Sequence, residues 1–364
     1  MAAEPLRVHH LSREAPLHTV AEMVRGQRLV GLTTGIGREP LAEGAAPCDA
    51  DVVHLHWPEE LVGWGRPVTA ESIAAALRAV DRAAGGAKVV MTVHNLVPHH
   101  PTPLGTDLYR AFLERADGLV HLGERSIRLT AEAFPGVASK PQVVVPHPNY
   151  DGLRTLLEPE ELPGGPRPGG DPVVMSFGAI RSAAEEAFLR DVRRRLKTRG
   201  ARAVLHVRTL EGRLKPLRRL RRRLLSLGCG PIEYRDGFVP DEQVLATFAE
   251  AHAVLLGRRG QLNSAVVPLA FTLSRRIAGP DEMVIGELLR AGDNAPYPPG
   301  DPAAAAEAVD RLLALPDPDS PVNRALADEW SVERNGAAHA AFYAALLGRE
   351  WTPSPAGAPT AASA

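Results

Sequence analysis

The chain has 364 residues, of which 45% are hydrophobic and 23% are charged. This composition is typical of a soluble globular protein with room for two domains, each with its own apolar core. Its 42 basic and 43 acidic residues give a formal charge of −1, which excludes a chain-wide electrostatic attraction to nucleic acid or acidic membranes. The only cysteines, Cys48 and Cys229, are too few and too far apart to indicate a disulfide framework or a cysteine-based zinc site.

The cellular compartment is predicted from the same features. Two isolated cysteines favour a reducing cytoplasm. The N-terminal residues carry acids, bases and prolines where a signal peptide needs an apolar stretch, and no window reaches the roughly 18 apolar residues of a membrane-spanning helix. We therefore expect a cytoplasmic protein that is soluble or at most peripheral to a membrane.

Short β-branched runs alternate with helical patterns in the first half of the chain. The pattern predicts strands at Val52–His56, Lys88–Val93, Gly118–Leu122 and Gln142–Pro146. Capping residues and apolar periodicity predict helices at Thr69–Ala84, Gly105–Ala116 and Glu124–Phe134. Because strands separated by helices form parallel sheets, we predict an α/β domain over residues 1–150.

A segment rich in proline and glycine then interrupts the alternation. Residues 151–171 contain ELPGGPRPGGD, which is typical of an interdomain linker. A second α/β domain is predicted over residues 172–330, with strands at Val173–Phe177, Ala203–Val207, Ile232–Tyr234 and Ala253–Leu256 and a short one near Ile277. Its predicted helices are Ser182–Arg199, a basic helix after Val207, Asp241–His252, Ser264–Ser274, and others near Asp281, Asp301 and Trp330. Residues 350–364 are expected to be a disordered tail.

Two of the predicted strands end abruptly in polar and aromatic residues. The first reads VVHLHWPEE from Val52 and the second reads VVMTVHNLVPHH from Val89. Ligands bind at the carboxyl ends of strands in open α/β sheets, so these two ends predict a binding site. Strand alternation places His54 and His56 on one face, but no acidic or cysteine partner stands at ligand spacing, and we expect no metal site.

Several common enzyme motifs are missing from the sequence. It contains no G-x-G-x-x-G after the first predicted strand, no P-loop, no G-x-S-x-G and no H-E-x-x-H. Dinucleotide binding, nucleoside triphosphate hydrolysis, serine hydrolysis and zinc proteolysis therefore lack their local signatures. This set of absences favours a fold whose site lies between two domains rather than on one loop.

The order of several sequence blocks carries a resemblance to a known family. The blocks are HLHWPE, TVHNLVPH, VVPHPNY (Val144–Tyr150), SFGAIR (Ser176–Arg181), DGFVPDEQV (Asp236–Val244) and NSA (Asn263–Ala265). In this order they resemble the GT-B glycosyltransferases, and within them the bacterial retaining family-four enzymes that build exopolysaccharide or decorate metabolites. The similarity spans roughly residues 50 to 345.

The resemblance implies an architecture and an activity. Two Rossmann-like domains would face each other across a cleft, and a C-terminal helix at residues 331–349 would cross back to the N-terminal domain. The first domain would hold an acceptor, which is a glycan, a lipid-linked glycan or a small metabolite. The second would hold a UDP- or GDP-linked sugar as substrate. The implied transfer is metal-independent, requires no cofactor and retains the anomeric configuration.

The implied donor site lies in the second domain. Arg181, just after Gly178, matches the family's phosphate-binding arginine, and a cation there would neutralise the leaving diphosphate. Asn263 and Ser264 match the family's N-S-G variant except that Ala265 replaces glycine, and a helix starting at Ser264 could offer backbone N–H groups to a phosphate.

The implied acceptor site lies in the first domain. His94 occupies the position of the family's active-site histidine and would act with Arg181 in catalysis. The acceptor would contact Trp57, which could stack on a sugar face, together with His56, Glu59, Asn95 and His99.

Several positions of the second domain depart from the family pattern. Ala184 stands where the family has a second phosphate-binding lysine, and Gln261 and Leu269 replace its two glutamates. The family's G-x-P-V becomes the segment 274–277. We considered that Arg258, Arg259 or Arg276 supplies the lost charge. The departures also allow a second function, that of a catalytically inactive GT-B-like binding or partner subunit.

A strongly basic segment lies at residues 190–223. It holds fifteen lysines and arginines against two acids, Asp191 and Glu211. A solvated outer helical face explains such a run, and so does attraction to an anionic membrane that carries a lipid-linked acceptor. Nucleic-acid binding is the least favoured explanation, because the run has no aromatic residues for base stacking.

Overall fold

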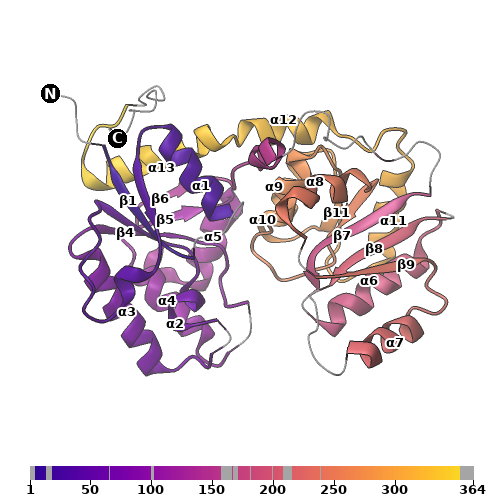
Figure 1. The fold of residues 1–364 in the computed structure, drawn as a ribbon, viewed down its shortest axis with the longest axis horizontal. Coiled ribbons are helices and arrows are strands. Elements are labelled where there is room, and N and C mark those ends of the chain that lie inside the picture. Colours follow the sequence, from indigo (N-terminus) through magenta and orange to yellow (C-terminus); the bar gives the residue numbers. More distant parts are fainter. Residues whose placement is uncertain are drawn as a thin grey trace, which may run out of the picture. The chain divides into compact units, whose positions relative to one another are not determined.

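The structure is a computed structural model that describes residues 5–13, 19–64, 66–99, 102–156, 166, 171–180, 182–198, 200–207, 215–237 and 239–352. The chain divides into two compact units (Figure 1). Unit 1 contains residues 1–148 and 330–364, and unit 2 contains residues 149–329.

Unit 1 is built on a parallel six-stranded sheet in the order β2-β1-β3-β4-β5-β6. The strands are β1 (Arg7–Leu11), β2 (Thr33–Ile36), β3 (Val52–Leu55), β4 (Lys88–Thr92), β5 (Gly118–His121) and β6 (Gln142–Val144). β1 is an interior strand next to the edge strand β2, because β2 pairs on one side of it and β3 on the other. Apolar residues from several strands of the sheet, such as Val8, Val52, Val90 and Val120, form the core against the C-terminal helix.

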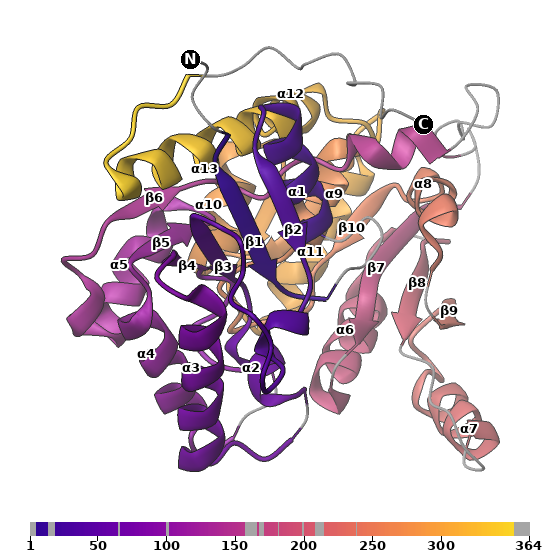
Figure 2. The same cartoon turned by 60° about the vertical axis from the view of Figure 1, so that its left-hand side comes forward.

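Helices cover both faces of this sheet. They are α1 (Thr19–Leu29), α2 (Pro58–Val62), α3 (Ala70–Ala84), α4 (Gly105–Arg115), α5 (Glu124–Ala133) and α13 (Val332–Leu347), with 3-10 turns η1 (Glu39–Leu41) and η2 (Pro135–Val137). Helix α3 starts in a capping box in which Thr69 and Ser72 exchange hydrogen bonds, and Gly85 ends it with a φ of 56°. Helix α13 lies beside α1 (Figure 2). Their close approach relies on Gly26 and Gly336, where an added Cβ would meet backbone atoms of the other helix at 2.0 and 2.2 Å.

Unit 2 repeats the design with a second parallel sheet in the order β12-β11-β10-β7-β8-β9. Its strands are β7 (Val173–Ile180), β8 (Arg202–Val207), β9 (Ile232–Asp236), β10 (Ala253–Leu255), β11 (Ile277–Pro280) and β12 (Ala295–Tyr297). Its helices are η3 (Asp151–Leu156), α6 (Ala183–Arg195), α7 (Lys215–Leu225), α8 (Asp241–Ala249), α9 (Val266–Thr272), α10 (Met283–Ala291), α11 (Pro302–Leu313) and α12 (Pro321–Glu329). Helix α11 packs on this sheet and on α6 through alanines and Val309.

The α/β class, the two Rossmann-like sheets and the packing of a C-terminal helix on the N-terminal domain are confirmed. Three elements, β1, α1 and β2, precede the first strand predicted from the sequence. The predicted start of a helix at Ser264 is wrong, because α9 begins at Val266. Residues 157–165 and 167–170 of the expected linker lie outside the described residues, and so does the predicted tail after residue 352.

Candidate functional site

In unit 1, the polar strand ends meet where the strand order of the sheet reverses. The chain goes from β1 outward to β2, and then returns past β1 to β3 and onward to β6. Ligand sites of open α/β sheets lie at the carboxyl ends of strands at such a reversal point. Here that place is between β1 and β3, which are followed by Ser12 and His56. The predicted ends of β3 and β4 therefore lie beside the end of β1, which the sequence reading had missed.

Four histidines form a continuous buried row at this edge. His10 pairs in register with His54 across β1 and β3, and His56 follows on the same face of the chain. His10 Nδ1 lies 3.0 Å from His56 Nε2, and His56 Nδ1 lies 3.2 Å from His94 Nε2. All four side chains are at most 5% exposed. His94 ends the row, and both ring nitrogens of His56 contact other histidines, so we place His56 behind His94 rather than against an acceptor.

Helices α1 and α13 complete this row from the other side. Gln27 lies 2.9 Å from His10 Nε2 and 3.1 Å from the Tyr343 hydroxyl. His54 contacts that hydroxyl at 2.6 Å and Thr92 Oγ1 at 2.7 Å. Burial lowers the pKa of His10 to about 3 and holds the pKa of His54 well below its usual range. These imidazoles are therefore neutral at physiological pH.

The row also brings three histidines within reach of a common metal ion. Ligand nitrogens of His10, His54 and His56 lie within 4.8 Å of one another, a grouping hidden from the sequence because β1 was not predicted. However, each ring nitrogen of His10 and His54 already has a hydrogen-bond partner within the protein. The geometry is that of a hydrogen-bonded network rather than of nitrogens converging on an ion.

Trp57 packs directly on the end of the histidine row. Its ring lies 4.4 Å from that of His94, centroid to centroid, with the planes 20° apart. His147, which follows β6, lies 5.6 Å from His94 in a nearly parallel orientation. One face of the Trp57 ring therefore packs against His94. The sequence predicted only that Trp57 stacks on a sugar.

Glu59 forms a second polar group beside the first. It lies on α2, with its carboxylate accepting hydrogen bonds from Tyr109 at 2.7 Å and from His99 Nδ1 at 2.6 Å. Burial opposes ionisation of Glu59, but the hydrogen bonds from His99 and Tyr109 outweigh it, and its pKa is lowered. Asn95 Nδ2 lies 3.3 Å from His99 Nε2. The structure therefore brings together Glu59, Asn95 and His99, three of the residues proposed from the sequence.

A cavity of about 390 Å³ opens next to Glu59. Its walls are mostly apolar, and Trp64 and Arg66 are among the residues that line it. The buried Thr102 hydroxyl has no hydrogen-bond partner among the described residues. An apolar cavity with a few polar groups is the usual form of a small-molecule site. The lining residues are Glu59, Val62, Gly63, Trp64, Arg66, Pro67, Val68, Pro98, Thr102 and Pro103.

Unit 2 has its own reversal point, between β7 and β10. The chain proceeds from β7 to β8 and β9, and then crosses back to β10 on the other side of β7. Gly178 lies at the end of β7, where the pairing with β8 shifts register, and its φ of 84° is in the left-handed region that favours glycine. Arg181 lies outside the described residues. Ser182 caps α6 as predicted, accepting from Glu185 N at 3.1 Å.

The other proposed donor residues follow β10. Asn263 and Ser264 lie in the loop before α9, and Ser264 Oγ accepts a weak hydrogen bond from Val266 N at 3.4 Å. The N-cap position belongs to Ala265, whose side chain cannot cap. Leu269, in the place of the family's ribose-binding glutamate, is 8% exposed and packs in the core.

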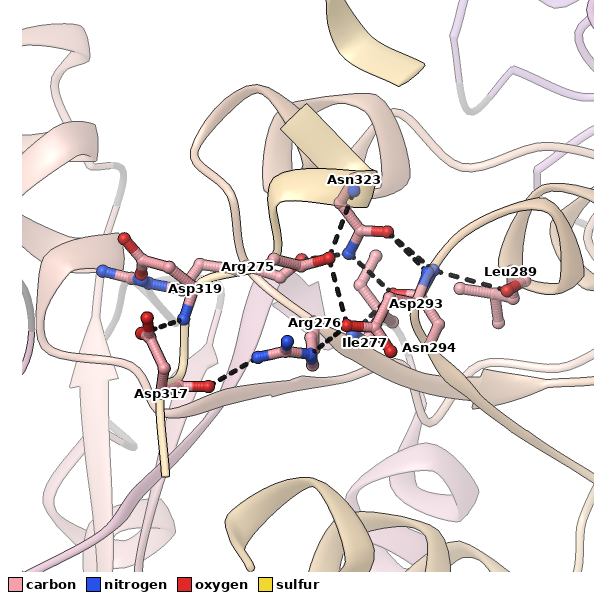
Figure 3. Close-up of polar contacts among 10 residues, drawn as sticks. Arg275, Arg276, Ile277, Leu289, Asp293, Asn294, Asp317, Asp319 and Asn323 are labelled. Carbon is pink, nitrogen blue, oxygen red and sulfur yellow. Dashed lines mark hydrogen bonds and ion pairs between the residues drawn. The ribbon is translucent and has the colours of Figure 1, made fainter. Parts of the chain in front are cut away.

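The arginines proposed to compensate for the missing charge differ in their surroundings. Arg276 donates to Asp293 at 2.7 Å and to the Asp317 carbonyl at 2.5 Å, within a network that also holds Asn323 (Figure 3). Its side chain is 11% exposed, so the proposed donor role of Arg276 is not supported. Arg258 pairs with Glu185 at 3.1 Å. Arg259 forms no ion pair with any residue in the described part of the chain.

The basic segment is only partly solvated in the described residues. Arg190 and Arg222 both pair with Glu186, and Arg222 also lies 5.3 Å from the ring centroid of Tyr234. The end of α7 and the turn after it nevertheless expose leucines, namely Leu220, Leu224, Leu225 and Leu227. Among the helices that the structure describes, none is long and apolar enough to cross a membrane.

Comparison with known proteins identifies the fold. No protein-family model and no curated protein matches the sequence. The fold is similar to that of a glycosyltransferase from Rickettsia africae, with a TM-score of 0.64 and 12% identity over 96% of this chain and 100% of that one. It is also similar to Anabaena HepE in complex with UDP-glucose (TM-score 0.58, 12% identity, 94% and 98% covered). AviGT4, a glycosyltransferase of avilamycin A biosynthesis, gives a TM-score of 0.56 with 17% identity over 96% and 100%. The chain therefore has the GT-B fold predicted from its sequence blocks.

Proposed function

We propose that the protein is a glycosyltransferase that moves a sugar from a nucleotide-sugar donor to a hydroxyl group of an acceptor. The main support is that described residues of the proposed site lie beside the reversal point of the sheet in each Rossmann-like unit, with His56 and Trp57 after β3 in unit 1 and Asn263 and Ser264 in the loop after β10 in unit 2. Solved glycosyltransferases share this fold, and one of them was crystallised with UDP-glucose. The acceptor class remains the one implied by the sequence, a glycan, a lipid-linked glycan or a small metabolite.

The proposed acceptor site is in unit 1. His94 would meet the reacting hydroxyl, and the Glu59–His99–Asn95 group would bind other hydroxyls of the acceptor. The apolar cavity beside Glu59 would receive the less polar part of the acceptor, with Trp64 as one wall.

The proposed donor site is in unit 2. Backbone N–H groups after Gly178 and around Asn263 and Ser264, together with Arg181, would hold the diphosphate. Arg259, which has no ion-pair partner in the described structure, is the best candidate to replace the missing lysine. We propose that the transfer is metal-independent, because arginines and backbone dipoles would carry the leaving-group charge, and that it proceeds with retention, as the resemblance to the family-four enzymes implies.

Thermal unfolding with a panel of UDP-, GDP- and dTDP-sugars tests the donor site. A ligand at 100 times its dissociation constant stabilises the native state by about 2.7 kcal/mol, so one nucleotide should raise Tm by several degrees. Arg259→Ala should weaken this shift. Arg290→Ala is the matched control, because Arg290 pairs with Asp281 on the surface of the same unit. Release of the free nucleotide in the presence of candidate acceptors then tests transfer itself.

An inactive binding subunit is the second candidate. It is favoured by Leu269, because a buried apolar side chain cannot bind the ribose hydroxyls that a glutamate would bind. If no nucleotide-sugar changes Tm, this second function replaces the first. A shift with free nucleotide but no release of it from any sugar donor also favours the inactive subunit.

We further propose that the exposed end of α7 contacts anionic membrane at the inner face. Leu224 and Leu227 are 57% and 72% exposed beside Arg221 and Arg223, a combination that favours an interfacial position. Vesicles with and without phosphatidylserine distinguish the outcomes. Binding that requires anionic lipid and weakens with salt supports the contact, and equal binding to both vesicles contradicts it.

A further inference from the structure

We propose that a buried chain of hydrogen bonds fixes the tautomer of His94, so that Nε2 carries the proton and Nδ1 is the hydrogen-bond acceptor. The chain starts at Tyr343 on the C-terminal helix and passes through Gln27, His10 and His56. This makes Gln27 and His10 positioning residues for His94. Only the identity of what Nδ1 binds, an acceptor hydroxyl, rests on the proposed function.

The direction of the chain is set by the contact between Gln27 and Tyr343. The Gln27 amide nitrogen donates to the Tyr343 oxygen at 3.1 Å. The hydroxyl hydrogen of Tyr343 is then directed to its other partner, His54 Nδ1, which lies 2.6 Å away. Tyr343 is therefore the donor and His54 Nδ1 the acceptor. The proton on the neutral His54 ring then resides on Nε2, which donates to Thr92 Oγ1 at 2.7 Å.

Gln27 passes this direction on to His10. Because the amide nitrogen of Gln27 is bonded to Tyr343, only the amide oxygen is left for His10. The amide oxygen of Gln27 then faces His10 Nε2 at 2.9 Å. An amide oxygen cannot donate, so His10 must carry its proton on Nε2. Gln27 is fully buried. Exchanging its amide oxygen and nitrogen would break both hydrogen bonds, because a donor would face the protonated nitrogen of His10 and the amide oxygen would face a Tyr343 oxygen whose hydrogen points to His54.

Each following histidine must then take the same tautomer. Neutral His10 has a lone pair on Nδ1, so the 3.0 Å contact requires His56 to donate from Nε2. His56 in turn accepts at Nδ1, so the 3.2 Å contact requires His94 to donate from Nε2. A neutral His94 consequently holds its lone pair on Nδ1. Burial keeps the first ring of this series uncharged, since it lowers the pKa of His10 to about 3.

The tautomer decides what His94 can do at the site. With Nδ1 as an acceptor, His94 can receive the hydrogen of a sugar hydroxyl and leaves the lone pairs of that oxygen for the glycosyl carbon. The opposite tautomer would donate to the hydroxyl oxygen and occupy one of those lone pairs. The stacked ring of Trp57, 4.4 Å away, holds the orientation of the His94 ring, while the buried chain would hold its proton.

Nitrogen NMR of protein labelled with ¹⁵N-histidine tests the proposal directly. The spectrum separates protonated from lone-pair ring nitrogens, and the signals of His94 are identified by their loss in His94→Gln. In the unmodified protein we expect the Nε2–H form of His94 to exceed the other by about tenfold or more, as one lost buried hydrogen bond implies. A dominant Nδ1–H form, or a ring protonated on both nitrogens at pH 7.5, overturns the proposal.

Two variants test whether the chain is the cause. Gln27→Met removes the amide at similar size, and Tyr343→Phe removes only the hydroxyl that sets the direction. In either folded variant the preference of His94 should fall to within a few fold. Gln142→Met is the matched control, because Gln142 contacts His121 Nε2 at 2.8 Å in a separate network of unit 1. If both variants keep the His94 signals of the unmodified protein, local surroundings fix the tautomer and the relay is refuted.

The result is independent of the proposed transferase activity. The NMR signals report the ring of His94 whether or not a sugar is transferred. If the protein shows the expected tautomer but has no transferase activity, the relay is supported and the proposed function is refuted. An active enzyme with the opposite tautomer keeps the function and loses the relay.

Discussion

Acidification should destabilise unit 1 through its buried neutral histidines. Burial lowers the pKa of His10 to about 3 and those of His121 and His339 to about 4, below the 6.5 of an unfolded chain. Because the folded pKa values are depressed, the unfolded state binds more protons. The stability that these groups contribute is complete above about pH 6.5 and is lost as the pH falls.

The size of the effect at pH 5.0 follows mainly from the unfolded pKa. Each histidine whose folded pKa lies well below 5 lowers the free energy of unfolding by about 2 kcal/mol when the pH falls from 7.5 to 5.0. The three groups with values near 3 or 4 together cost about 6 kcal/mol, which is comparable with the total stability of a typical domain. Glu59 does not oppose this trend, since its pKa is lowered from 4.5 and it stays ionised in this range.

Tryptophan fluorescence during urea unfolding measures this loss in unit 1 alone. All four tryptophans, at positions 57, 64, 330 and 351, belong to that unit. His339→Gln should reduce the pH-dependent loss by about 2 kcal/mol, whatever its effect at pH 7.5. Phe342→Leu, a core change on the same helix, should leave the pH dependence unchanged. A loss below about 1 kcal/mol in the unmodified protein, with a constant m-value, would refute the reasoning.

Three further predictions concern packing and polar contacts. Gly26→Ala should destabilise unit 1 by more than about 3 kcal/mol, because the new Cβ would meet the Val332 carbonyl oxygen at 2.0 Å; Gly136→Ala, with its nearest atom at 3.5 Å, is the control in urea melts. Arg276→Gln should lower the urea midpoint of unit 2 by an amount equivalent to about 1–3 kcal/mol, because its contacts with Asp293 are lost. Weaker binding of the sugar donor with unchanged stability would contradict this structural role of Arg276. Glu59→Gln should raise KM for the acceptor in steady-state assays more than it changes donor affinity, whereas an equal effect on both would exclude an acceptor role.

The sequence predicted most of the fold because apolar strand patterns after residue 50 alternate with helical patterns, some of which have clear capping residues. Thr69 and Gly85 mark the ends of α3 as the capping rules require. β1 was missed because five residues, RVHHL, carry two histidines where a buried strand normally has apolar side chains. One of the two, His10, was its functional signal, since a polar side chain in a buried strand needs a partner.

The buried row could not have been found from local patterns. His10 meets His54 through strand pairing across 44 residues, and Tyr343 comes from the other end of the chain. Alternation correctly placed His54 and His56 on one face, but it could not reveal that His56 is covered by its neighbours. A short-range sequence pattern predicts which face of a strand a residue lies on. Only the fold shows which residue lies opposite it.

The positions of unit 2 that differ from the family pattern change side-chain contacts rather than the course of the backbone. Ser274, where the resemblance implies a glycine, has a φ of 59°, in the left-handed region that favours glycine. A carboxylate has no such substitute, because the backbone around Leu269 is committed to α9 and its side chain to the core. The departures therefore remove side-chain contacts that the proposed donor site would need for ribose recognition, and they leave the shape of the unit intact. Donor binding should consequently depend on the diphosphate, and UDP should stabilise unit 2 far more than uridine does; equal shifts in Tm from the two would contradict this.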